Sequence, residues 1–128
     1  MRRFADAVRD AGVPWIFHSD GDLTSVLPEL VELGITGLNP IEPACMDMAT
    51  IREEYPDLVL SGNVDVDMLS RGTPAQVRER VRELMAQMGP SGRYFISSGN
   101  SIASYCDVEN VLAMADAVLE FGQYPISV

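Results

Sequence analysis

Apolar and polar residues follow a repeating order along the chain: a helical stretch that ends in glycine, a short apolar run, and then a polar cluster. The first unit is an amphipathic stretch at 2–11 that stops at Gly12, followed by an apolar run at 14–17. Apolar residues three and four positions apart are typical of a helix, whereas four or five continuous apolar residues are typical of a buried strand. The pattern therefore predicts a repeated unit of helix and strand.

The unit recurs along the rest of the chain. We expect further strands at 35–38, 58–61 and 93–97, and helices at 23–33, at 46–55, after Thr73, and from Asp107 to Gly122. The helix after Thr73 has the clearest start, because Thr73 and Gln76 form a capping box around Pro74. Continuous apolar strands that alternate with helices indicate an α/β fold with a parallel sheet.

Each predicted strand is followed by side chains that can bind or catalyse. These are His18 and Asp20, Asn39 and Glu42, Asn63 and Asp65, and Asn100 and Ser101. All strand ends meet on one face of a TIM (β/α)8 barrel, whereas a doubly wound sheet brings fewer of them together. Four βα units are half a barrel. We therefore expect residues 1–128 to form a single half-barrel domain, as a fragment of a longer chain or as a unit that assembles with a second half.

Composition narrows the class of partner. The chain has nine arginines, no lysine, 19 acidic residues and a net charge of -10, with 47% hydrophobic residues. The acidic balance argues against nucleic acid and membrane surfaces as partners, and the lack of lysine excludes Schiff-base chemistry on this chain. Cys45 and Cys106 form no CxxC pair, which fits a reducing, cytoplasmic compartment. No GxGxxG or GxxxxGK[ST] motif follows a strand.

Three segments carry a family resemblance: "FHSDGDLTSVLPELVELGITGLNPIEP", "LSGNVDVDMLSRGTPAQVRERV" and "FISSGNSIASYCDVENVLAMADAV". In this order they resemble the C-terminal half of the uroporphyrinogen decarboxylase superfamily. That superfamily includes the decarboxylase of haem biosynthesis, corrinoid-dependent methyltransferases and relatives of cobalamin-independent methionine synthase. The resemblance runs from about Phe4 to Pro125. It implies a (β/α)8 barrel with its cleft at the carboxyl ends of the strands, of which this chain matches strands five to eight.

The chain departs from both main branches of this superfamily. The resemblance implies a histidine on the last loop of the decarboxylases, where this chain has Asn100, and an asparagine cannot act as an imidazolium. The methyltransferases hold zinc with a His-x-Cys after the first of these strands and a cysteine on the last loop. Here the first motif is His18-Ser19-Asp20 and Cys106 lies six residues too late. Both sulfur ligands are therefore missing.

Three hypotheses follow. The first is a decarboxylase-like enzyme part that needs no cofactor, acts on a carboxylated small molecule such as a tetrapyrrole, and receives its substrate-binding arginines from the other half. Its expected catalytic residues are His18, Asp20 and Asn100, and its substrate contacts are Asn39, Glu42, Asn63, Asp65 and Ser101. The second is a corrinoid-dependent methyltransferase domain with zinc. The third is a non-catalytic half-barrel remnant that binds a partner or self-associates. Structural roles also remain open, notably a strand-end hydrogen bond for His18, a turn for Asn63 and a helix cap for Asp22.

Overall fold

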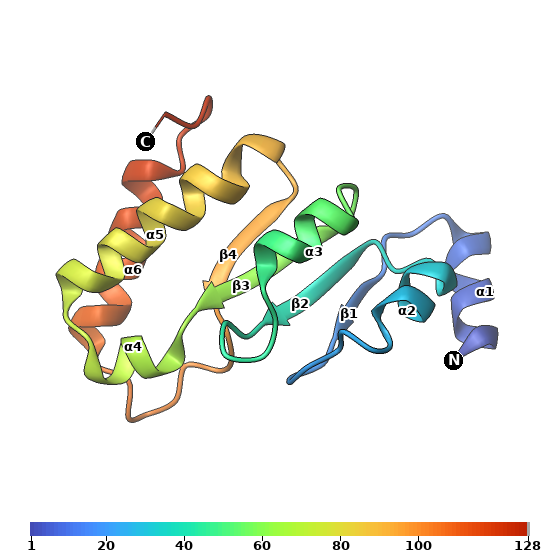
Figure 1. Cartoon of the computed structure of the whole chain (residues 1–128), viewed down its shortest axis with the longest axis horizontal. Coiled ribbons are helices and arrows are strands. Elements are labelled where there is room, and N and C mark those ends of the chain that lie inside the picture. The colour runs from blue at the N-terminus through green and yellow to red at the C-terminus, as the bar shows by residue number, and fades with distance from the viewer. Residues whose placement is uncertain (128) are drawn as a thin grey trace.

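Four strands lie side by side in one parallel sheet. They are β1 (Ile16–His18), β2 (Gly37–Ile41), β3 (Val59–Val64) and β4 (Tyr94–Ser98), and their order in space is their order in sequence (Figure 1). A doubly wound sheet reverses its strand order at a switch point, whereas successive barrel strands always pair with the next. The predicted α/β half-barrel is therefore confirmed. The computed structural model describes residues 1–127 of the chain.

In the described part of the chain, six helices connect or flank the strands. They are α1 (Arg2–Ala11), α2 (Leu27–Leu33), α3 (Met48–Glu54), α4 (Val66–Arg71), α5 (Pro74–Met88) and α6 (Val108–Phe121), and a short 3-10 turn spans Gly89–Ser91. The capping box of Thr73 and Gln76 and the cap by Asp107 are present as predicted. Asp22 does not cap α2, because it accepts the Thr24 N–H and Leu23–Val26 form a turn before the helix. Helix α4 was not predicted, since six residues are too few to show helical periodicity.

Two of the strands run further than their apolar residues indicate. The sequence predicts strands that end at residues 38 and 61, whereas β2 continues to Ile41 and β3 to Val64. The parallel pairing of the backbone continues through the polar positions. As a result Asn39 and Asn63 lie inside strands, and not on the loops that follow them.

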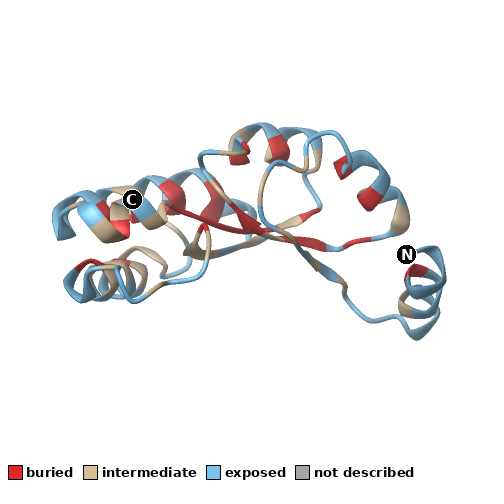
Figure 2. Ribbon diagram, turned by 90° about the horizontal axis from the view of Figure 1, so that it is seen from below, coloured by how far each residue is buried: buried red, intermediate tan, exposed pale blue. Residues whose placement is uncertain are grey.

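Helices α2 to α6 cover one face of the sheet and bury an apolar core against it. Around β2 and β3, Leu38 and Leu60 are fully buried beneath residues of α2 and α3, and a second cluster joins Val64 to α4, α5 and α6. Figure 2 shows the buried residues gathered along the strands and on the sides of the helices that face them. We call this side of the sheet the covered face.

The opposite side of the sheet, the open face, carries the residues that alternate with those of the core. Ile16 on β1 and Phe95 on β4 point to this side, and they are 52% and 60% exposed. Nearer the carboxyl ends of the strands, the open face carries His18, Asn39, Ser61 and Ser97. Its apolar part is therefore exposed, and its polar part lies at the end of the sheet where barrel active sites form.

A bulge between β2 and β3 changes the direction of the side chains that follow it. The register shifts between Leu38 and Ile41, and both Gly62 and Asn63 have positive φ values, of 113° and 79°. A Cβ atom on Gly62 would lie 2.8 Å from the backbone nitrogen of Ile41, so only glycine fits there without movement. Beyond the bulge, Asn63 turns away from the open face.

Candidate functional site

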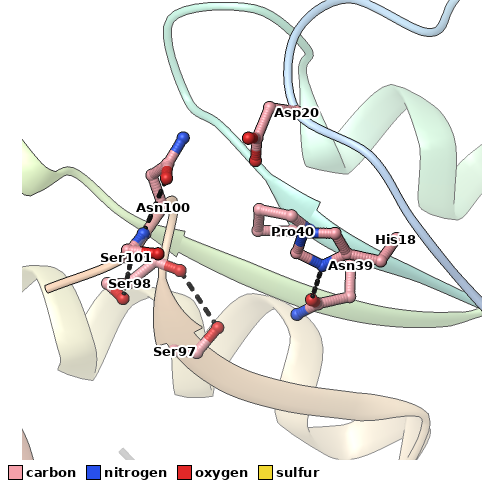
Figure 3. Close-up of a pocket in the computed structure, with 8 residues that line it drawn as sticks. All are labelled: His18, Asp20, Asn39, Pro40, Ser97, Ser98, Asn100 and Ser101. Atoms are coloured by element: carbon pink, nitrogen blue, oxygen red, sulfur yellow. Dashed lines mark hydrogen bonds between the residues drawn. The ribbon is translucent and has the colours of Figure 1, made fainter.

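A pocket of about 230 Å³ lies where the loops after β1 and β4 approach the end of β2. Its lining consists of His18, Asp20, Asn39, Pro40, Ser97, Ser98, Asn100 and Ser101 (Figure 3). Five of these are side chains that the sequence predicted for a site: His18, Asp20, Asn39, Asn100 and Ser101. The parallel sheet thus brings the polar residues of three strand ends together, as barrel geometry requires.

Hydrogen bonds join the polar side chains of the open face from strand to strand. His18 Nδ1 lies 2.8 Å from Asn39 Oδ1, and Asn39 Nδ2 donates to Ser61 Oγ at 2.8 Å. Ser61 Oγ is in turn 3.3 Å from Ser97 Oγ. This line of four side chains, which we call the polar row, takes one residue from each strand. It holds the His18 ring against the sheet at the edge of the pocket (Figure 3).

The loop after β4 is fixed by its own polar groups. The Gly99 N–H donates to the carbonyl of Val64 at 2.7 Å, and the Ser98 hydroxyl donates to the carbonyl of Asn100. The Asn100 side chain accepts the Ser101 N–H at 2.7 Å through Oδ1. The Nδ2 group of Asn100 has no acceptor among residues 1–127, so it can donate to a ligand. In Figure 3, Asn100 stands across the pocket from His18.

Among the described residues that line the pocket, Asp20 alone carries a carboxylate. Within residues 1–127 its oxygens accept no hydrogen bond and form no ion pair, whereas Asp47 and Asp65 cap helices and Glu83 pairs with Arg80. The next residue along, Gly21, donates its N–H to Glu42 Oε1 at 2.9 Å. That bond ties the loop that carries Asp20 to the loop after β2. The carboxylate of Asp20 is therefore positioned but not engaged.

Three predicted site residues lie outside the pocket lining. Glu42 holds the Gly21 backbone, as described above. Asn63 is buried beyond the bulge, where it donates to the carbonyl of Ile41 and accepts from Arg80. Asp65 caps α4 by accepting the Asp67 N–H at 2.8 Å. Each of these side chains has a structural partner, and a substrate contact for any of them stays a prediction.

Sequence reasoning missed Ser61 and Ser97 as members of the polar row. Both are hydroxyls inside strands that begin with apolar residues, where a serine alone indicates no function. Their one signal is position: Ser61 follows Leu60, which pairs with Leu38 of β2, just as Asn39 follows Leu38. That pairing is known only once the register of β2 against β3 is known.

The polar groups that line the pocket are one carboxylate, one imidazole, amides and hydroxyls. None of the described residues that line it is an arginine, and Arg80 donates instead to Asn63 on the covered face. Tyr94 also lies on the covered side, where burial raises the pKa of its hydroxyl and the group donates to the Gly62 carbonyl at 2.8 Å. The described part of the chain therefore offers the pocket one imidazole, one carboxylate, amides and hydroxyls, but no cation to bind a substrate carboxylate.

A zinc site needs at least three protein ligands, and these residues do not fit one. The pocket holds one imidazole and one carboxylate, and no group of three His, Cys, Asp or Glu side chains that could hold a metal occurs within residues 1–127. Cys45 and Cys106 are free thiols that do not line the pocket. Burial, together with the nearby charges of Glu42 and Asp22, raises the pKa of the Cys45 thiol, which disfavours the thiolate that zinc requires.

Comparison with known proteins identifies the family of this chain. A family model described as uroporphyrinogen decarboxylase (URO-D) matches residues 1–121. The chain belongs to the uroporphyrinogen decarboxylase family. Two curated relatives named "Uroporphyrinogen decarboxylase" match it over 122 residues: one from Anaeromyxobacter dehalogenans (strain 2CP-C) at 33% identity and one from Anaeromyxobacter sp. (strain Fw109-5) at 31%. Each match covers 95% of this chain but 34% of the relative, so the chain spans about a third of the length of these relatives.

A solved structure shows the same fold. A "methyltransferase from Methanosarcina mazei" superposes with a TM-score of 0.73 over 95% of this chain and 34% of its own length, at 23% sequence identity. The resemblance inferred from the three sequence segments is thus confirmed at the level of family and fold. In the described residues, no helix is long and apolar enough to cross a membrane.

Proposed function

We propose that this chain supplies one wall of the substrate cleft of a uroporphyrinogen decarboxylase-like barrel, and that the reaction is the loss of carbon dioxide from a carboxylated pyrrole. The observation that carries the proposal is the meeting of His18, Asp20 and Asn100 in one pocket at the carboxyl ends of the strands. The names of the two curated relatives favour this reaction over others. Because they are about three times as long as this chain, their activity is carried over to it only as part of the proposal.

The available groups suit a reaction without a metal. In such a decarboxylation the pyrrole ring is protonated at carbon, the bond to the carboxyl carbon breaks, and its electron pair returns to the cationic ring. A proton then takes the place of the released carbon dioxide, and the ring carbon gives up the proton that it had gained, so that one proton is taken up for each carbon dioxide released. The carboxylate of Asp20 can stabilise the cationic ring once the rest of the barrel covers this exposed pocket, because fixed charges act strongly in a site from which water is excluded. His18 and Asn100 can orient the substrate by hydrogen bonds.

The carboxylates of such a substrate need cations that this wall does not provide. We propose that they come from the rest of the barrel, which also covers Ile16 and Phe95 on the open face. The length of the curated relatives supports this occupant, since about two thirds of each lies outside the matched region. A second copy of this chain is the alternative occupant.

Sedimentation separates these occupants. We expect the 14.0 kDa chain by itself to self-associate weakly through the uncovered face, and Phe95→Glu to reduce that association. A defined, tight dimer would instead make a second copy the occupant. A well-folded monomer whose behaviour does not depend on Phe95 would contradict the half-barrel interpretation of the open face.

A chimera tests the reaction. The 122-residue stretch of the Anaeromyxobacter dehalogenans relative that matches this chain is replaced by the chain itself, so that the rest of the relative supplies the remaining barrel. We expect the folded chimera to release carbon dioxide from uroporphyrinogen slowly, and Asn100→His to raise the rate. Asp20→Asn should abolish it. A folded chimera that stays inert with and without histidine at position 100 would contradict a decarboxylase role.

A corrinoid-dependent methyltransferase is the second candidate, favoured by the position of His18 after the first strand. The pocket lacks the thiolates of that branch, so it offers zinc no complete set of ligands. Stoichiometric zinc that is lost in His18→Ala would favour the methyltransferase. A chain that binds neither pyrroles nor zinc in the chimera would favour the non-catalytic remnant. We also propose a cytoplasmic location, because the two cysteines of the chain are free thiols, as is usual in a reducing compartment.

A further inference from the structure

The polar row ends at a backbone carbonyl, that of Ser98, which can only accept a hydrogen bond. Ser97 is the last side chain of the row, and its hydroxyl donates to the backbone carbonyl of Ser98 at 3.1 Å. A serine hydroxyl has one proton to donate, and a carbonyl has none. Ser97 Oγ is closer to this carbonyl than to Ser61 Oγ, at 3.1 Å against 3.3 Å, which favours the Ser97 proton on Ser98 and leaves Ser97 Oγ to accept from Ser61.

A Ser97 proton that points to the Ser98 carbonyl determines which atom donates in each of the other hydrogen bonds of the row. With the Ser97 proton on Ser98, Ser61 donates its single proton to Ser97 Oγ, and its own oxygen is left to accept from Asn39. Only the Nδ2 group of the Asn39 amide can donate, which places Oδ1 toward His18. Because Oδ1 is an acceptor, the nitrogen that faces it, His18 Nδ1, must carry a proton.

We propose that the polar row holds neutral His18 in its Nδ1–H tautomer and presents the Nε2 lone pair to a pocket ligand. Asn39 is then a positioning residue, which acts on the substrate through His18, and Ser61 and Ser97 set its orientation. Nε2 has no hydrogen-bond partner in the described part of the chain, and His18 lines the pocket (Figure 3). In this tautomer, Nε2 of His18 can accept a proton from a ligand in the pocket or donate its electron pair to one. The importance of this tautomer rests on the proposed function, but its existence does not.

The chain suits a direct measurement because it contains one histidine. Long-range proton–nitrogen correlation spectra of the 15N-labelled, full-length chain distinguish the protonated from the unprotonated ring nitrogen, and every imidazole signal belongs to His18. At a pH where the ring is neutral we expect the Nδ1–H form to predominate. Predominance of the Nε2–H form in the unmodified chain would overturn the proposal.

Ser97→Ala tests the role of the row. Without its acceptor the Ser61 hydroxyl can turn toward Asn39, the amide can reverse, and Nδ2 can then donate to His18 Nδ1. We expect the ratio of Nδ1–H to Nε2–H forms to fall by about two- to tenfold, which corresponds to one net hydrogen bond. Ser98→Ala is the matched control, because it keeps the backbone carbonyl that ends the row. It should leave the ratio unchanged.

A second substitution restores the tautomer if the proposal is right. Asn39→Asp places only acceptor oxygens next to His18 Nδ1, so the double variant Asn39→Asp/Ser97→Ala should recover the Nδ1–H form. Amide spectra confirm that each variant is folded. Equal ratios in Ser97→Ala and Ser98→Ala would overturn the proposal, whatever the chimera shows. An inert chimera that keeps the Nδ1–H tautomer would refute the decarboxylase and leave the row intact.

Discussion

The two faces of the sheet are built from neighbouring residues of the same strands, yet they differ in almost every respect. On the covered face, Leu38 and Leu60 are fully buried beneath helices. On the open face, the adjacent positions carry exposed apolar side chains at one end and the polar row at the other. Strand alternation alone produces this division. The difference teaches that, within residues 1–127, the chain packs helices against one side of its sheet and leaves the side with the candidate site open.

The largest expected effect comes from one truncation on each face. Leu60→Ala should lower the free energy of unfolding by about 2–5 kcal/mol, because it leaves a cavity in a packed core. Phe95→Ala should change it by less than about 1 kcal/mol, since that ring is already largely in water. Urea unfolding followed by circular dichroism measures both. Equal costs would show that the open face is packed in solution and would break the comparison.

A substitution at Gly62 tests the bulge, beyond which Asn63 points away from the open face. Gly62→Ala should cost about 1–3 kcal/mol, because a side chain there meets the Ile41 backbone at a positive φ. Gly92→Ala is the matched control: its φ is also positive, at 70°, but nothing lies within 4 Å of the added atom. Its cost should be about 1 kcal/mol from backbone strain alone. A Gly62 variant no worse than the Gly92 variant would show that the bulge relaxes easily.

The same bulge limits how much of the candidate site the sequence could predict. The apolar runs and the glycines that end the helices predict the elements, and barrel geometry then predicts that His18, Asp20 and Asn100 approach one another. Asn63 obeys the same sequence pattern but lies elsewhere, because the positive φ values at Gly62 and Asn63 turn it toward Arg80. The bulge depends on how two strands pair across the sheet. Neither strand shows it alone.

A smaller effect is expected where the covering helices begin. Thr73 accepts the Gln76 N–H, and Gln76 accepts the Thr73 N–H at 2.9 Å, so that each satisfies a donor that α5 leaves unpaired. Thr73→Ala should therefore lower stability by about 1 kcal/mol. Thr73→Ser, which keeps the hydroxyl, is the control and should stay close to the unmodified chain. If the alanine variant is equally stable, α5 is held by its packing alone.

The smallest effect is a dependence on pH at the start of α3. The Thr50 hydroxyl, 2.6 Å from Asp47 Oδ2, and the Thr50 and Ala49 N–H groups hold the pKa of Asp47 below its usual range. The folded state thus favours the ionised carboxylate. This stabilisation is fully present above the unfolded value of about 3.9 and is lost as the pH falls through the lower folded value.

Asp47→Asn separates the charge of that cap from its shape. Asparagine caps helices about as well as aspartate, so the variant should match the unmodified chain at pH 7 to within about 0.5 kcal/mol. Between about pH 4 and pH 3 the unmodified chain should lose the carboxylate contribution, while the variant has none to lose. The gap in urea midpoint between the two proteins should therefore narrow or change sign on acidification. A gap that stays constant from pH 7 to pH 3 would show that the carboxylate of Asp47 adds nothing beyond hydrogen-bond geometry on the covered side of the sheet.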